Sequence, residues 1–310
     1  MTNVLVTGGA GFIGSHLCEA LVARGHRVRV LDNLVTGYLT NLESIRDKIE
    51  FIQGDATDRD TCLAACRGIE VVFHEAAIPS VPRSMDNPVE SHHACVSTTV
   101  HILDAARRCG VRRVINAASS SAYGNTEQLP KREDATPQPM SIYAVAKVAG
   151  EYYCRVFAES LGVDTVNLRY FNIFGPRQDP SSPYSGVIAK FIKLMSAGKR
   201  PTIFGDGLQS RDFTYVANVV HANLLAMQKK EPLRGAVLNV GCGERVTVLQ
   251  LVDELNKILG TNIQPEFAPA RPGEVLHSQA SWEKIHETLG YQPQVRFAEG
   301  LRRTVEAEIG

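Results

Sequence analysis

The feature that most constrains the fold is a glycine-rich segment that follows the first apolar run of the chain. Residues 4–7 have a strand pattern, and T-G-G-A-G-F-I-G at 7–14 leads from it into a helical pattern. Glycine permits a tight turn and lets the backbone come close to a pyrophosphate, whose charge the free N–H groups of the helix N-terminus stabilise. The spacing of Gly8, Gly11 and Gly14 therefore predicts a dinucleotide site.

Two acidic residues follow later strands of the same pattern. Asp32 ends the second predicted strand, where a carboxylate accepts hydrogen bonds from ribose hydroxyls and repels a 2′-phosphate, so that NAD is favoured over NADP. Asp55 follows the third strand, and two interpretations stay open for it: a contact to the adenine edge, or the N-cap of the next helix.

Short apolar strands alternate with helical patterns through the first half of the chain. Strands are expected at 4–7, 27–31, 50–52, 71–73, 114–115 and 165–169, and helices at 12–24, 58–66, 88–109 and 141–161. This alternation is typical of a parallel sheet with helices on both faces. We predict an α/β fold with a Rossmann-type doubly wound parallel sheet, whose NAD-binding domain spans residues 1–171.

The rhythm loosens after residue 171. Loops rich in proline and glycine separate helices expected at 184–197, 216–228, 247–259, 281–288 and 297–308, with strands at 202–204 and 237–239. Residues 172–310 are predicted to form a smaller C-terminal α/β lobe that binds the substrate, with segments near 216–242 returning to the first domain.

Composition excludes several classes of partner and site. The 33 basic and 33 acidic side chains balance, so neither nucleic acid nor an anionic membrane is favoured as a partner. The seven scattered cysteines are expected to be reduced thiols, and no apolar run approaches the roughly 20 residues of a membrane span. We expect a cytoplasmic protein without a metal site, since His92 and His93 lack an acidic or cysteine ligand pattern.

A tyrosine and a lysine lie four residues apart in the helix predicted at 141–161. Tyr143 and Lys147 therefore share a helix face, and an ammonium near a phenol lowers the phenol pKa. A tyrosinate near neutrality can take a hydroxyl proton while hydride leaves the adjacent carbon. Ser119, Ser120 and Ser121 follow the fifth strand, where such sheets place their ligands, and can bond the same substrate oxygen.

At these residues the chain resembles an extended short-chain dehydrogenase/reductase, specifically the UDP-N-acetylglucosamine/UDP-glucose 4-epimerase family. The resemblance covers nearly the whole chain. Besides the glycine loop and the tyrosine–lysine pair, it rests on H-E-A-A at 74–77, S-S-S-A-Y-G at 119–124, R-Y-F-N at 169–172, G-D-G-x-x-S-R-D-F at 205–213 and R-P-G-E at 271–274.

The resemblance implies a reaction and a set of partners. Tightly bound NAD oxidises the sugar at carbon 4 while Tyr143 takes the hydroxyl proton, the 4-keto sugar turns in the pocket, and hydride returns to its other face. Ser119 matches the family's catalytic serine, which Ser120 and Ser121 lie close enough to assist. The partner is a UDP-sugar, and helices 88–109 and 141–161 imply a homodimer.

The resemblance also implies the remaining site residues. The cofactor group comprises Gly8, Gly11, Phe12, Ile13, Gly14, Asp32, Asn33, Gly37, Asp55, Ala56, Ala76, Ala77, Tyr143, Lys147 and Tyr170. The substrate group comprises Ser80, Arg83, Ser121, Tyr143, Asn172, Val187, Ile203, Phe204, Arg211, Arg271 and Ser278. Arg211 and Arg271 match arginines that clamp the diphosphate.

Ser278 bears on the choice of sugar. It stands where strict UDP-glucose epimerases carry a bulky tyrosine, and a small side chain leaves room for an N-acetyl group at carbon 2 without excluding glucose. UDP-N-acetylglucosamine is the favoured substrate and UDP-glucose the alternative. One departure is Cys95, which stands where relatives carry an asparagine near the cofactor.

Other reactions of the family and a non-catalytic role are less well supported. A nucleotide-sugar 4,6-dehydratase needs Asp-Glu directly after the catalytic serine or threonine, and a related decarboxylase needs a glutamate there, whereas this chain has Ser120 and Ser121. A reductase would favour NADP, against which Asp32 argues. A non-catalytic dinucleotide sensor usually lacks the tyrosine or the lysine, and both are present.

Overall fold

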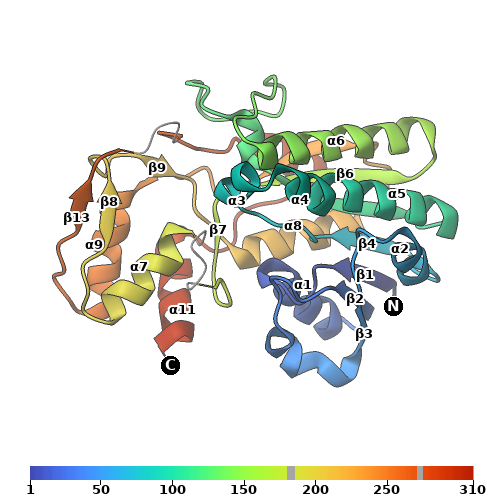
Figure 1. Ribbon diagram of the computed structural model, residues 1–310, viewed down its shortest axis with the longest axis horizontal. Coiled ribbons are helices and arrows are strands. Elements are labelled where there is room, and N and C mark those ends of the chain that lie inside the picture. Colours follow the sequence, from blue (N-terminus) through green and yellow to red (C-terminus); the bar gives the residue numbers. More distant parts are fainter. Residues whose placement is uncertain (180–185, 271–274, 310) are drawn as a thin grey trace.

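The computed structural model describes residues 1–179, 186–270 and 275–309. Its centre is a seven-stranded parallel sheet in the order β11-β6-β5-β4-β1-β2-β3 (Figure 1). The strands are β1 (Asn3–Thr7), β2 (Arg27–Asp32), β3 (Ile49–Gln53), β4 (Val71–His74), β5 (Arg113–Ser119), β6 (Asp164–Tyr170) and β11 (Ala236–Val240). The predicted doubly wound parallel sheet is confirmed.

Strands β1, β2, β4 and β5 send alternate side chains into two separate cores, because side chains along a strand point to opposite faces. Val4 and Val6 lie in one core with α1 (Phe12–Ala23) and α8 (Val216–Gln228). Leu5 lies in the other core, with helices α2 (Arg59–Cys66), α5 (Thr98–Cys109) and α6 (Ile142–Ser160). Burial on both faces explains why these strands read as continuous apolar runs.

The strand order reverses at β1, which pairs with β2 on one side and with β4 on the other. The carboxyl ends of β1 and β4 therefore open onto a crevice that no crossover helix fills, which is where sheets of this kind bind ligands. The glycine loop, His74 and the end of β5 all lie at this edge.

The second lobe lies beside the carboxyl edge of the sheet (Figure 1). It contains α7 (Val187–Ser196), α9 (Val248–Leu259), α11 (Phe297–Ile309) and the parallel pair β8 (Thr202–Phe204) with β13 (Glu266–Ala268). Short two-residue pairs join it to the sheet: β7 (Ile173–Phe174) with β10 (Thr214–Tyr215), and β9 (Ser210–Arg211) with β12 (Val246–Thr247). The division at residue 171 stays a prediction.

Several elements differ from those expected. The helix predicted at 88–109 is three segments, because a π-helical turn at His93–Ser97 separates α4 (Pro88–His92) from α5. A 3₁₀ stretch at Leu39–Lys48 and the helix α3 (Val81–Asp86) were not predicted. The helix expected at 184–197 is described from Val187, since residues 184 and 185 lie outside the described ranges. The helix expected at 281–288 is α10 (Glu283–Leu289). Across the described residues, no helix is long and apolar enough to cross a membrane.

Candidate active site

The glycine loop has the geometry that a pyrophosphate site needs. Gly8 has φ +69°, and a Cβ there would come within 2.8 Å of the Ala76 Cα. A Cβ at Gly14 would come within 2.2 Å of the Gly8 carbonyl oxygen, so α1 packs against the loop only with glycine at that position. Gly11 is the N-cap of α1 and has no side chain to accept the N–H groups of the first helical turn, which starts with Phe12 and Ile13. These N–H groups can therefore serve an anion, and the loop fits the diphosphate of NAD.

Asp32 lies at the end of β2 and is 7% exposed. Its Oδ2 accepts the Ala10 N–H at 2.9 Å, and its Oδ1 accepts the Leu34 N–H at 2.8 Å. Each oxygen keeps a lone pair for a ribose hydroxyl. A Cβ at Gly37 would lie 3.0 Å from Oδ1, so glycine there leaves the carboxylate accessible. Burial raises the pKa of Asp32.

The alternative of Asp55 as a helix N-cap is wrong. Asp58 caps α2 by accepting the Thr61 N–H. Asp55 instead accepts the Thr57 N–H at 2.7 Å and the Asn33 Nδ2 at 2.9 Å, which joins two residues predicted for the adenosine end of the cofactor. Ala56 beside it is buried.

A fully defined hydrogen-bond chain fixes the residues of the H-E-A-A motif. The Ala76 N–H donates to the Thr7 hydroxyl, which lies 2.8 Å from Nδ1 of His74, while Nε2 of His74 lies 3.1 Å from the Thr99 hydroxyl. Thr99 itself donates to the Cys95 carbonyl, so it accepts from Nε2–H, and the imidazole is neutral with its proton on Nε2. Burial accordingly lowers the pKa of His74 to about 3.

Tyr143 and Lys147 lie on the first turns of α6, beside the carboxyl end of β5. The Lys147 Nζ donates to the Ala117 carbonyl at 2.8 Å and lies 5.9 Å from the centroid of the Tyr143 ring. The Tyr143 N–H donates to the Ser84 hydroxyl at 3.1 Å, a contact that was not predicted. Ser141 caps the helix by accepting the Ala144 N–H.

The sum of effects on Tyr143 differs from the prediction. Burial raises the pKa of Tyr143 above its usual value, and the nearby Cys95 and Glu75 raise it further. Lys147 and a hydrogen bond with Ser119 lower the pKa, in the predicted direction, but they do not overcome burial. Cys95, 2% exposed, packs in the same apolar cluster as Tyr143 and Ala77. A phenol in this cluster stays protonated without a further positive charge beside it.

Two of the three predicted serines meet at the tyrosine. The Ser121 hydroxyl donates to the Ser119 hydroxyl at 2.9 Å, and Ser119 is bonded to Tyr143. Ser120 begins the 3₁₀ turn Ser120–Tyr123, and its hydroxyl makes no hydrogen bond within the described part of the chain. The arrangement places Ser119 and Tyr143 side by side to share one substrate oxygen.

A cavity of about 330 Å³ lies in the second lobe. Its walls include five of the predicted substrate residues, namely Asn172, Val187, Ile203, Phe204 and Arg211. Asn172 has φ +40° and donates through Nδ2 to the Asp212 carbonyl. It lies two residues after Tyr170, which pairs with Ser119 across β5 and β6. The strand partner of the serine therefore leads directly into the cavity wall. Sequence reasoning missed Gln178, Lys190 and Gln209 on the cavity walls.

Ser80, Arg83 and Ser278 lie outside the walls of this cavity. Ser80 caps α3, and the Arg83 guanidinium forms a two-point ion pair with Glu90. Ser278 is 8% exposed and donates its N–H to the carbonyl of Ser210, the residue directly before Arg211. Arg271 and Glu274 lie outside the described residues.

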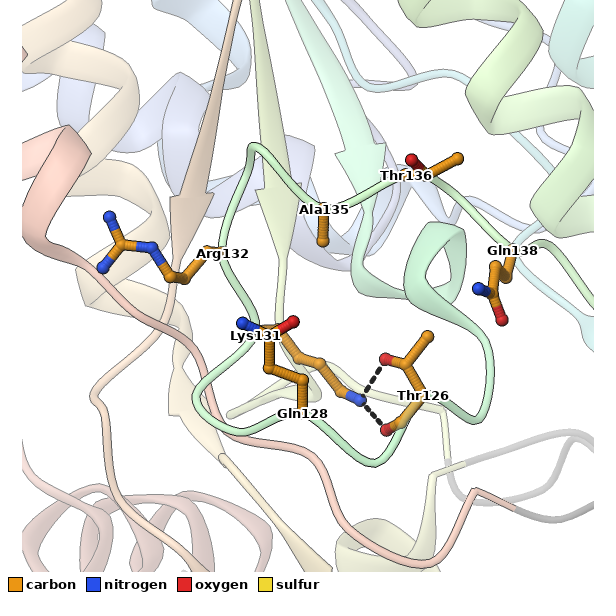
Figure 2. Close-up of a pocket in the computed structure, with 7 residues that line it drawn as sticks. All are labelled: Thr126, Gln128, Lys131, Arg132, Ala135, Thr136 and Gln138. Atoms are coloured by element: carbon orange, nitrogen blue, oxygen red, sulfur yellow. Dashed lines mark hydrogen bonds between the residues drawn. The ribbon is translucent and has the colours of Figure 1, made fainter.

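A loop from the sheet holds the segment that carries Ser278. The Lys131 N–H donates to the Gln279 carbonyl, and the Lys131 carbonyl accepts the Ser281 N–H. Figure 2 shows the Lys131 ammonium folded back onto the carbonyl and hydroxyl of Thr126, beside a second cavity of about 220 Å³. None of the predicted site residues lines this second cavity. The loop therefore serves to fix the backbone on both sides of Ala280.

Known proteins resemble the chain over almost its full length. Residues 4–241 match the model of the NAD dependent epimerase/dehydratase family. The chain belongs to this family. It is 41% identical over 309 residues to a UDP-glucose 4-epimerase of Mycolicibacterium smegmatis, and the alignment covers 98% of this chain and 97% of the relative.

Two solved structures have the same fold. One is a UDP-N-acetylglucosamine 4-epimerase from Methanobrevibacter ruminantium in complex with UDP-N-acetylmuramic acid, with a TM-score of 0.95, 37% identity, and 99% and 98% of the two chains covered. The other is a UDP-glucose 4-epimerase from Thermus thermophilus in complex with NAD, with a TM-score of 0.90, 37% identity and 99% of both chains covered. The predicted class is confirmed: an NAD-dependent nucleotide-sugar epimerase of the extended short-chain dehydrogenase/reductase type.

Proposed function

We propose that the chain is a UDP-N-acetylglucosamine 4-epimerase, which interconverts UDP-N-acetylglucosamine and UDP-N-acetylgalactosamine through a 4-keto intermediate. The observation that carries the proposal is the meeting of Ser119, Tyr143 and Lys147 at the carboxyl edge of the sheet, beside a glycine loop built for a dinucleotide. A base, a hydroxyl donor and a redox cofactor at one edge are what oxidation of a secondary alcohol requires.

The chain's own residues divide the work at carbon 4 of the sugar. NAD, when bound, supplies the hydride acceptor and later the donor. Tyr143 removes the proton of the 4-hydroxyl and returns it to the 4-keto sugar, while Ser119 holds the same oxygen by a hydrogen bond, assisted by Ser121. Lys147, anchored on the Ala117 carbonyl, supplies the positive charge that favours the tyrosinate.

The cavity of the second lobe suits the UDP part of the substrate. We assign the apolar walls at Val187, Ile203 and Phe204 to the uracil, and the guanidinium of Arg211, on the same cavity, to the diphosphate. Asn172 lies between this cavity and the serine and is assigned to the sugar. Arg271 is proposed as a second phosphate ligand from the sequence alone.

The preference for the N-acetylated sugar depends on Ser278. Hydrogen bonds with Lys131 and with Ser210 fix the backbone of its segment. The space beside Ser278 therefore depends on the size of its side chain. UDP-glucose 4-epimerase is the alternative, supported by the relative from M. smegmatis. A 4,6-dehydratase is disfavoured, because Ser120 and Ser121 supply no carboxyl group for the elimination.

We also propose a homodimer that forms through α6. Val145, Tyr152, Tyr153 and Val156 recur on one side of this helix at helical spacing and are 43–57% exposed. Val89 on the neighbouring α4 is 67% exposed. Large apolar side chains gathered on one face are typical of an interface.

The decisive assay uses purified protein without added cofactor. UDP-N-acetylglucosamine and UDP-glucose are supplied separately, and the 4-epimers are followed by NMR, with Tyr143→Phe as the matched inactive control. The proposal predicts UDP-N-acetylgalactosamine, formed faster than UDP-galactose. Turnover of UDP-glucose alone would reject the assignment of the sugar, and no turnover of either, even with NAD supplied, would reject the epimerase.

A further inference from the structure

Glu75 is a charged residue at the carboxyl edge that the reaction scheme above leaves without a role. It directly follows β4, and its N–H donates to the Thr7 carbonyl at 3.2 Å. In the register of β4 and β5, His74 lies opposite Asn116, so Glu75 lies beside Ala117. The carbonyl of Ala117 is the one that holds the Lys147 ammonium. The carboxylate and the catalytic lysine are therefore neighbours across two adjacent strand ends.

Two polar side chains hold the Glu75 carboxylate in place. Asn223 of α8 donates through Nδ2 to the Tyr170 hydroxyl at 2.8 Å, and the Tyr170 hydroxyl lies 2.7 Å from Oε1 of Glu75. Because the Asn223 Nδ2 donates to the phenol oxygen, the phenol hydrogen is free to be donated to the carboxylate. Asn223 is fully buried and Tyr170 is 8% exposed, so this row of hydrogen-bonded side chains is held inside the protein. The backbone of Tyr170 lies opposite Ser119 of β5, and its side chain reaches across β5 to Glu75.

The charge of Glu75 acts on the tyrosine. Burial raises the pKa of Glu75 to about 7, while the Tyr170 hydrogen bond and Lys147 lower it. The carboxylate in turn raises the pKa of Tyr143, and that of the buried Cys18 thiol on α1. The remaining group on the strand, His74, is neutral. Glu75 is thus a buried acidic group beside the Lys147 ammonium, with a pKa near neutrality.

We propose that Glu75 is a positioning residue for the redox step, whose negative charge, held by Tyr170 and Asn223, opposes ionisation of Tyr143 and favours the positively charged oxidised nicotinamide over the neutral reduced one. This inference rests on the proposed function and on the assignment of Tyr170 to the cofactor. Its effect would be to favour the oxidised form of the cofactor in the resting enzyme.

The test compares Glu75→Gln, which removes the charge and keeps the shape, with Glu70→Gln as a matched control. Glu70 precedes the same strand at the opposite edge of the sheet and is exposed. Tyr170→Phe removes the donor and keeps the carboxylate. Three readouts apply to the NAD-loaded proteins: the tyrosinate absorbance of Tyr143 against pH without substrate, the acid limb of kcat/KM, and the fraction of cofactor found reduced with a UDP-sugar.

For Glu75→Gln we expect the pKa of Tyr143 and the acid limb to fall by about 0.5–1 pH unit, as for a charge several ångströms away at an effective dielectric of roughly 20–40. We expect the reduced fraction to rise several-fold. Tyr170→Phe should give a smaller change of the same sign, and Glu70→Gln none. Unchanged values in Glu75→Gln would overturn the inference. If the wild type turns over no UDP-sugar, the proposed function fails, while the tyrosinate titration still decides the role of Glu75.

Discussion

The Lys147 ammonium lies 5.9 Å from the centroid of the Tyr143 ring and is anchored at 2.8 Å on the Ala117 carbonyl of β5. The anchor fixes the positive charge between the sheet and the phenol, one helical turn from the tyrosine. Because burial raises the pKa of Tyr143, the lysine offsets only part of that cost. The positive charge of oxidised NAD, when bound, would further favour the tyrosinate.

Replacing Tyr143 by phenylalanine is expected to remove the proton acceptor and leave the fold intact. We expect turnover of the UDP-sugar to fall by roughly 10²–10⁴-fold, the usual contribution of general acid–base catalysis. The purified protein should still contain NAD, since phenylalanine keeps the ring of Tyr143 and the glycine loop and Asp32 are untouched. Turnover within a few-fold of the wild type would show that another group takes the proton.

Replacing Ser278 by tyrosine should exclude the N-acetyl group. Because Lys131 and Ser210 fix the backbone around Ser278, the added ring must occupy the space that the small side chain leaves. We expect kcat/KM for UDP-N-acetylglucosamine to fall at least tenfold relative to UDP-glucose, as a steric clash of this size implies. Ser278→Ala is the control and should keep both activities. Equal losses for the two sugars would mean that Ser278 does not select between them.

His74 predicts how stability depends on pH. Its pKa is about 3 in the folded protein, against an ordinary value of 6.5. Between these values the unfolded chain binds a proton that the folded chain does not, so the free energy of unfolding falls as pH drops from about 6.5 towards 3. The slope from this group is at most about 1.4 kcal/mol per pH unit.

Urea unfolding at several pH values, with His74→Gln alongside, measures this slope. The variant is expected to be less stable at pH 7, because it loses the bonds to Thr7 and Thr99. It should also lose stability less steeply below pH 6.5. Parallel curves for the two proteins would assign the acid sensitivity to other groups.

The proposed dimer can be tested on α6. Tyr152→Glu with Val156→Glu places two charges on the exposed apolar face, where burial against a partner would be costly. We expect a dimer of the wild type and a monomer of the variant by light scattering, with the far-ultraviolet spectrum unchanged. Glu43→Lys, exposed on the 3₁₀ stretch Leu39–Lys48 and not on α6, is the charge control and should stay dimeric. A monomeric wild type would reject the proposal.

Much of the fold follows from residue patterns, because the inner strands β1, β4 and β5 are buried on both faces. Arg27–Asp32 and Asn3–Thr7, for example, match the expected strands to within a residue. The π-helical turn at His93–Ser97 was not predictable, because the apolar pattern continues through it and only side chains such as Thr99, which bond back to the helix carbonyls, mark it.

The candidate site was predicted unevenly for a similar reason. The glycine loop and the tyrosine–lysine pair are each local in sequence, so the spacing within each motif predicts how its residues lie. Glu75, Tyr170 and Asn223 come from three distant segments, and their contact depends on how β4, β6 and α8 are arranged around β5. The one signal in the sequence was an acidic residue that follows His74, two positions after the wholly apolar run at 71–73.

The most direct test of the central claim follows the hydrogen at carbon 4. UDP-N-acetylglucosamine carrying deuterium at that carbon is incubated with the purified protein in ordinary water, and the product is analysed by NMR and mass spectrometry. The account predicts UDP-N-acetylgalactosamine that keeps its deuterium at carbon 4, because the hydride leaves to bound NAD and returns from it. A product in which solvent hydrogen has replaced the deuterium would contradict the account.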